Sequence, residues 1–257
     1  MTLSYVVSGF AVGLLVGLTG VGGGSLMTPL LTLLFGIHPS VAVGTDLAFA
    51  SATKVAGTFA HRFKGTVRWD VVKLLCYGAL PAAVVSTLLL KHFGAISDSI
   101  GQVIRYSIAI SVSLTVIALL FKGKLQAWLN ANPEKQLHGR QLAIATVICG
   151  VVLGTLVTIS SIGAGAVGAT LLVLLYPRLS PAEIAGTDIA YAVPLTAVAA
   201  FGHWWLGSID WVLLSALLLG SVPGITIGSL AARAVPEKFL RGLLAITLTS
   251  VALKLVW

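Results

Sequence analysis

Long stretches without charged side chains alternate with short polar segments along this 257-residue chain. The main uncharged stretches are Met1–Val43, Leu74–Leu90, Tyr106–Phe121, Gln141–Pro177 and Trp211–Ala232. Each approaches or exceeds the ~20 apolar residues that an α-helix needs to cross the ~30 Å hydrocarbon core of a bilayer. The pattern therefore predicts an all-α polytopic membrane protein.

The chain also contains an internal repeat. The segment Pro39–Ala50, PSVAVGTDLAFA, matches Pro181–Ala192, PAEIAGTDIAYA. Upstream, the glycine-rich TGVGGG at Thr19–Gly24 matches SSIGAG at Ser160–Gly165. Identities continue downstream at Phe59/Phe201, His61/His203, Gly65/Gly207, Trp69/Trp211, Gly78/Gly220 and Pro81/Pro223. We therefore predict two repeats that share one plan.

Each repeat is expected to contain five helical segments. They span 3–19, 25–36, 39–62, 68–91 and 100–121 in the first repeat, and 140–159, 163–176, 181–205, 209–232 and 237–256 in the second. The second segment of each repeat is too short to cross a bilayer alone, so we expect an interrupted or hairpin helix pair followed by three spanning helices. The repeats occupy 1–121 and 140–257, and a polar linker occupies 122–139.

Loop charges indicate that the two repeats have opposite orientations in the membrane. Three basic side chains follow the third segment of the first repeat: Arg62, Lys64 and Arg68. The matching loop of the second repeat, His203–Asp210, contains no Lys or Arg. The loop after the fourth segment reverses this pattern, with its basic cluster in the second repeat: Arg233, Lys238 and Arg241. Because short basic loops stay cytoplasmic, the sequence predicts inverted-topology repeats, a cytoplasmic linker and two external termini.

Composition narrows the function classes. Hydrophobic residues make up 57% of the chain and charged residues 9%, and the mean hydropathy is +1.02, which excludes an ordinary soluble domain. The net charge of +8 is assigned to cytoplasmic loops, and no nucleic-acid partner is expected. Cys76 and Cys149 lie in apolar segments and indicate no disulfide. Without a nucleotide-binding loop, an HExxH motif or a cysteine pair, the sequence predicts no cofactor and no metal.

The glycine-rich loops are candidate anion-binding sites. Each precedes a short helix, whose N-terminus would present free backbone N–H groups and the positive end of the helix dipole inside the membrane. Such backbone is tolerated there only where it is buried in protein or lines a water-filled cavity. The candidate substrate-binding residues of these loops are Gly22, Gly23, Gly24, Ser25, Ser161, Gly163 and Gly165. Alternatively, the glycines only allow helices to pack closely.

Asp46 and Asp188 are matched residues within the two GTD sequences. The sequence SPAE at Ser180–Glu183 is a capping box, which predicts that the helix begins near Pro181 and places Asp188 ~10 Å inside it. A carboxylate inside a membrane helix costs about 2.5–3.5 kcal/mol on insertion scales. The two residues are therefore candidate proton-coupling or gating groups. Alternatively, each carboxyl group is hydrogen-bonded to the neighbouring broken-helix backbone and is purely structural.

Four other repeat-matched residues are gating candidates as well. Thr45 and Thr187 directly precede the two Asp residues, and His61 and His203 lie at the ends of equivalent helices. Histidine is the side chain whose ordinary titration falls closest to physiological pH. The alternative is that both histidines are simply residues of the membrane interface.

Lys54 lies fifteen residues into the helix that begins near Pro39, and its repeat counterpart is Thr196. Helix side chains tilt toward their own N-terminus, so the ammonium group is expected to point toward the middle of the membrane. Lys54 is therefore the candidate cationic partner of a transported anion. The alternative is an internal ion pair with Asp46.

The chain resembles the sulfite exporter TauE/SafE family of membrane permeases. The resemblance rests on GLTGVGGGSLMTPLL near the N-terminus, on VGTDLAFA followed by a basic loop, and on the degenerate second copy. It covers nearly the whole chain, and it implies transport of small anions such as sulfite, thiosulfate, sulfonates or short carboxylates. The second loop, SSIGAG, departs from the first, so the two repeats need not contribute equally.

Interrupted helices in inverted repeats are typical of alternating-access carriers. Together with the resemblance, they favour a secondary transporter, and in particular an exporter, of small sulfur-containing or organic anions in the bacterial inner membrane. An anion channel, an uptake permease or a membrane-embedded enzyme are the alternatives, and we expect no enzyme. The expected partners are the anion, a proton as coupling ion, and the lipid bilayer. The sequence leaves open which anion is moved, in which direction and with which coupling ion, and whether the protein forms homo-oligomers.

Overall fold

The structure, a computed structural model, describes residues 2–19, 24–63, 65–94 and 96–231, and beyond these only 242, 246, 248–250 and 254. The described residues form α-helices, one 3₁₀ helix and connecting loops, with no β-strand among them. The prediction of an all-α chain is therefore confirmed for this part of the molecule.

The helices follow the predicted segments closely, except at the end of α5. Their bounds are α1 Thr2–Thr19, α2 Gly24–Leu34, α3 Pro39–Phe63, α4 Trp69–His92, α5 Asp98–Ala131, η1 Pro133–Lys135, α6 Gly139–Ser160, α7 Ala166–Leu175, α8 Pro181–Trp205 and α9 Trp211–Ala231. Most of the predicted tenth segment, 237–256, lies outside the described residues.

Among the described residues, five helices are long and apolar enough to cross a membrane. These are α4, α5, α6, α8 and α9, the last over Trp211–Gly228. By contrast, α2 has 11 residues and α7 has 10, and at 1.5 Å per residue each is only ~15–17 Å long. The two short helices predicted from the sequence are therefore present, and the chain has the composition of a polytopic membrane protein.

Helix α5 is longer than expected because it runs through the first half of the predicted linker. It contains 34 residues, or ~51 Å of helix, and so extends well past a ~30 Å hydrocarbon core. The residues after Phe121 are polar but include Lys, Leu, Gln and Ala, which are good helix formers. Polarity ends the membrane-spanning stretch without ending the helix, which stops only before Pro133.

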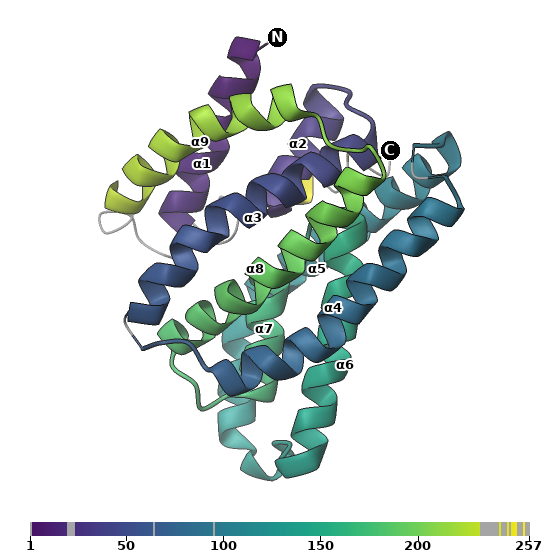
Figure 1. Cartoon of the computed structure of the whole chain (residues 1–257). Coiled ribbons are helices and arrows are strands. Elements are labelled where there is room, and N and C mark those ends of the chain that lie inside the picture. Colours follow the sequence, from purple (N-terminus) through teal and green to yellow (C-terminus); the bar gives the residue numbers. More distant parts are fainter. Residues whose placement is uncertain are drawn as a thin grey trace.

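Helices α3 and α8, which carry the two GTD sequences, lie side by side through the centre of the molecule (Figure 1). Around them, α1 packs against α9, and α4 packs against α6. Each of these outer pairs joins the first helix of one sequence repeat to the fourth helix of the other. The two repeats are therefore interleaved through their helix contacts.

Glycines bring the outer helix pairs into close contact. A Cβ atom at Gly78 of α4 or at Gly150 of α6 would collide with the backbone of the facing helix. Their repeat counterparts, Gly220 of α9 and Gly9 of α1, make the same backbone approach in the other pair. Small residues that let backbones approach are typical of helix interfaces in membranes. Equivalent positions in the two repeats thus make equivalent contacts.

Candidate functional site

The two GTD carboxyl groups are buried on the central helices. Asp46 is the eighth residue of α3 and is 0% exposed, and Asp188 is the eighth residue of α8 and is 5% exposed. The predicted capping box of α8 is confirmed, because Ser180 Oγ accepts from the Glu183 N–H and the Glu183 carboxylate accepts from the Ser180 N–H. Neither Asp is an N-cap, and each lies ~10 Å along its helix.

Asp46 is held by a hydroxyl group from the short helix α2. Thr28 Oγ1 donates a hydrogen bond of 2.6 Å to Asp46 Oδ2. The other carboxyl oxygen, Oδ1, is buried and has no hydrogen-bond partner within the described part of the chain. Ser161 Oγ, also buried and unpartnered there, lies close enough to interact with this carboxyl group but outside hydrogen-bond geometry. The loop between α6 and α7 therefore reaches Asp46.

Asp188 faces the beginning of the other short helix, α7. The Gly165 backbone N–H interacts with its carboxylate. One turn later, a Cβ atom at Gly168 would collide with Asp188 Oδ1 and with Tyr191 Oη, so both oxygen atoms occupy the space beside this glycine. Both atoms are buried, and neither has a hydrogen-bond partner among the residues that the structure describes.

Two lysines interact electrostatically with the buried carboxyl groups. Lys54 of α3 is partly buried, and its charge interacts most strongly with Asp188 and less strongly with Asp46. Lys122 of α5 interacts electrostatically with Asp188 as well. The sequence placed Lys122 in the linker, whereas in the structure it belongs to α5. Positive charge from two different helices thus reaches the region between the GTD sequences.

The loop between α6 and α7 passes between the two Asp residues and needs glycine to do so. Ser161 ends α6 in the left-handed region at φ 59°, and Gly163 and Gly165 have φ values of 138° and 126°. Such values are accessible to glycine and strained for other residues. Ser161 lies beside Asp46 and Gly165 beside Asp188. The chain therefore turns next to both carboxyl groups.

The remaining candidate site residues of the glycine-rich loops, and His61, have no described contact with the two carboxyl groups. Gly163 packs against the Val157 side chain of α6. Gly24 and Ser25 begin α2, but nothing is described of the Ser25 side chain. Gly22 and Gly23 lie outside the described residues, as does the side chain of His61 at the end of α3.

The GTD threonines bind loops instead of facing the carboxyl groups. Thr45 Oγ1 accepts a hydrogen bond of 3.1 Å from the backbone N–H of Asp210, just before α9. Thr187 Oγ1 accepts one of 3.1 Å from the backbone N–H of Arg68, just before α4. Asp210 and Arg68 are themselves repeat counterparts, so each repeat supplies the same bond to the other.

His203 lies near the end of α8, and its side chain is buried within the protein. It is 0% exposed, with Nδ1 2.9 Å from Ser208 Oγ and Nε2 2.9 Å from the Thr158 carbonyl oxygen. Because a carbonyl only accepts, Nε2 is the donor in that bond. The imidazole therefore ties the end of α8 to α6, about 15 residues along α8 from Asp188.

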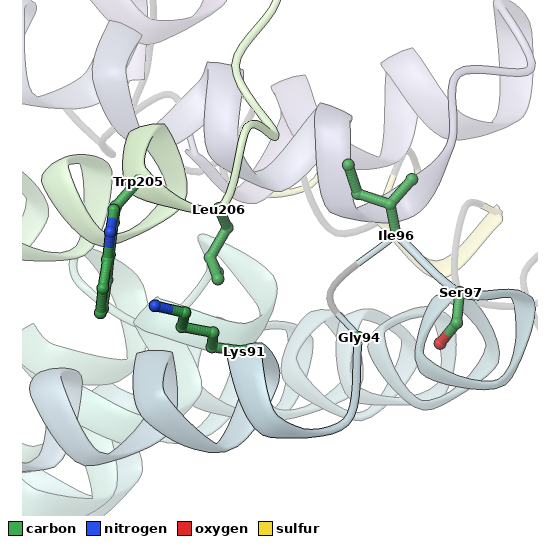
Figure 2. Close-up of a pocket in the computed structure, with 6 residues that line it drawn as sticks. All are labelled: Lys91, Gly94, Ile96, Ser97, Trp205 and Leu206. Atoms are coloured by element: carbon green, nitrogen blue, oxygen red, sulfur yellow. The ribbon is translucent and has the colours of Figure 1, made fainter.

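A pocket of about 430 Å³ opens elsewhere, at the ends of α4 and α8 and the beginning of α5. Figure 2 shows its lining residues: Lys91, Gly94, Ile96, Ser97, Trp205 and Leu206. The Lys91 ammonium lies 3.4 Å from the centroid of the Trp205 ring, a cation–π contact. Trp205 is the last residue of α8, seventeen positions from Asp188, so this pocket is separate from the buried carboxyl cluster.

Sequence reasoning missed four residues of the cluster: Thr28, Lys122, Gly168 and Tyr191. The position of Tyr191, three residues after Asp188, places both on one face of a helix, so this spacing was a usable signal. Nothing local in the sequence connects Thr28 with Asp46 or Lys122 with Asp188, because those contacts join different helices.

Comparison with known proteins identifies the family of the chain. A family model for the sulfite exporter TauE/SafE matches residues 5–255. YjnA of Bacillus subtilis (strain 168), named a "probable membrane transporter protein", is 38% identical over 229 residues, which cover 89% of each chain. YdhB of the same organism, with the same description, is 29% identical over 243 residues and 93% of each chain.

A protein of Xylella fastidiosa (strain 9a5c), again described as a "probable membrane transporter protein", is 27% identical over 97% of this chain and 93% of its own. No solved structure gives a significant match. The family model spans nearly the whole length, and the first of these relatives exceeds 30% identity over most of it. The chain therefore belongs to the sulfite exporter TauE/SafE family and is a membrane transporter.

Proposed function

We propose that the protein is a secondary transporter that exports small sulfur-containing or organic anions, such as sulfite, thiosulfate or sulfonates, by alternating access. The observation that carries the proposal is the buried cluster at the α3–α8 contact, where Lys54 acts on Asp46 and Asp188 beside the α6–α7 loop. Charged side chains inside membrane segments mark ion and substrate pathways.

In this proposal the anion binds between Lys54 and the backbone of the glycine-rich loops. An ammonium group and backbone N–H groups are the donors that form strong, charge-assisted hydrogen bonds with oxyanions. Gly165 already directs its N–H toward a carboxylate, that of Asp188. A transported sulfite or sulfonate would offer the same kind of oxygen atoms to the same donors.

We further propose that the chain consists of two inverted repeats, 1–121 and 140–257, joined by a cytoplasmic linker at 122–139, with both termini external in the bacterial inner membrane. The reciprocal bonds from Thr45 to Asp210 and from Thr187 to Arg68 support this arrangement. Each bond brings the beginning of one GTD helix beside the loop after the GTD helix of the other repeat. That exchange is expected when equivalent helices begin on opposite sides.

A binding screen followed by a transport assay tests the proposal. Purified protein is heated with sulfite, thiosulfate, sulfoacetate, taurine or short carboxylates, and a bound anion should raise the apparent melting temperature. The stabilising anion is then loaded into proteoliposomes, where efflux should saturate with concentration and show counterflow. Efflux that rises linearly without counterflow would indicate a channel, and the absence of any stabilising anion would reject this substrate class.

A further inference from the structure

The two GTD carboxyl groups have different surroundings, although their helices are equivalent. The match of LLTLLF (Leu30–Phe35) with LLVLLY (Leu171–Tyr176) aligns α2 with α7. At the position of Thr28, which holds Asp46, the second repeat has Ala169. The second repeat therefore lacks the hydroxyl group that binds the carboxylate in the first.

In the second repeat, the space beside Gly168 holds the hydroxyl group of Tyr191 instead. Where the first repeat has the buried side chains Met27 and Phe49, the second has Gly168 and Tyr191. The missing side chain at Gly168 makes room for Asp188 Oδ1 and Tyr191 Oη, and neither atom has a hydrogen-bond partner in the described chain. A buried carboxyl oxygen without a hydrogen-bond partner is costly unless a further group satisfies it.

The charged groups around Asp188 favour a proton as that further group. Lys54 from α3 and Lys122 from α5 act on Asp188, the Gly165 N–H of α7 interacts with it, and Tyr191 lies on its own helix. Tyr191 also lies near the uncharged thiol groups of Cys76 on α4 and Cys149 on α6. Hard metal cations require about six oxygen ligands, and two ammonium groups would repel them.

We propose that Asp188 is the carboxyl group that takes up and releases the coupling proton, whereas Asp46 is a structural group that fastens α2 to α3. This inference rests on the proposed transport function. A proton from the aqueous phase binds a carboxylate oxygen of Asp188, and the new O–H donates to Tyr191 Oη. The removal of one negative charge leaves Lys54 and Lys122 to be balanced by the transported anion, so anion and proton bind together.

Infrared difference spectroscopy tests the assignment without any substrate. As the pH of the wild-type protein is lowered, the C=O stretch of a buried protonated carboxyl group should appear. The band should be absent in Asp188→Asn, retained in Asp46→Asn, and moved to higher frequency in Tyr191→Phe, which removes its hydrogen-bond acceptor. A band that survives in Asp188→Asn, or is lost in Asp46→Asn alone, overturns the proposal.

Thiosulfate, whose charge is constant near neutral pH, tests the coupling. Its affinity for the wild-type protein should rise about tenfold for each unit by which the pH falls through the titration, because one proton binds with one anion. In Asp188→Asn the affinity should not change with pH, whereas a retained tenfold dependence overturns the proposal. If no anion binds the wild-type protein, the proposed transport function fails, and the infrared band still decides the role of Asp188.

Discussion

At the scale of single residues, the two repeats differ in charge inside the GTD helices, at the position of Lys54. The second repeat has Thr196 there, and its hydroxyl group donates to the Ala192 carbonyl within α8. Lys54 instead acts across the helix contact on Asp188 and also on Asp46. Lys54 therefore interacts electrostatically with both carboxyl groups, and more strongly with the one on the other helix.

Replacing Lys54 by Met should weaken anion affinity by about ten- to a hundredfold, because a hydrogen bond to a charged group contributes roughly 1.5–3 kcal/mol. Isothermal titration with the anion identified in the binding screen measures the effect. Lys135→Met is the matched control, since Lys135 lies in η1 near Trp128 and far along the chain from the cluster. Equal affinities in both variants would contradict the role of Lys54.

Replacing Thr28 by Val should destabilise the protein by about 1–3 kcal/mol, because Asp46 Oδ2 would lose its buried donor. The melting temperature in detergent is the measurement. Thr32→Val is the control, since Thr32 Oγ1 only donates to carbonyl oxygens of its own helix. If the two variants melt at the same temperature, the bond between Thr28 and Asp46 contributes little.

At the scale of elements, glycine has two separate functions in this protein. At Gly163 and Gly165 it allows backbone angles that turn the chain beside the carboxyl groups. At Gly9, Gly78 and Gly150 it allows two helix backbones to touch. Glycine therefore allows close helix packing in the outer helix pairs and a turn of the backbone in the loop before α7.

Gly150→Ala should lower the melting temperature, because the added methyl group would collide with the backbone of α4 at Leu75 and overpacking costs about 1–3 kcal/mol. Gly123→Ala is the opposite case on α5, where a Cβ atom meets nothing within 4 Å. There the higher helix propensity of alanine should stabilise by up to ~1 kcal/mol. The melting temperatures of both variants are measured side by side, and a shift in the same direction for both would contradict this expectation.

At the scale of the whole molecule, each outer helix pair contains one helix from each repeat: α1 packs against α9, and α4 packs against α6. The central α3 and α8 lie side by side (Figure 1), and the α6–α7 loop reaches both of their Asp residues there. In the proposed alternating-access carrier, a binding site at this contact would open to opposite sides of the membrane as the two halves rock against each other.

Single cysteines at Gly65 and Gly207 test the orientation of the two repeats. Both glycines are exposed, with φ values of 66° and 71° and no atom within 4 Å of a Cβ position, so the two substitutions are structurally matched. In a background with Cys76 and Cys149 replaced by Ala, a membrane-impermeant maleimide should label residue 207 in intact cells and residue 65 only after lysis. Labelling of both from the same side would reject the inverted topology.

The sequence by itself determined the class of the protein and most of its helix bounds. Long hydrophobic runs, the capping box at Ser180 and helix-breaking glycines are local features, so they can be read along the chain. For the same reason the short helices and the burial of Asp46 and Asp188 could be expected. The end of α5 could not be predicted in this way, because polar residues limit the membrane-spanning stretch but do not end a helix.

Only the tertiary structure decided which polar side chains meet. Thr28 reaches Asp46, and Lys122 reaches Asp188, through the packing of separate helices, and His203 is buried because α6 covers it. Repeat symmetry predicts the same surroundings for both Asp residues. The difference between them arises from neighbours on other helices, and those contacts depend on helix crossing and rotation, which local sequence patterns do not specify.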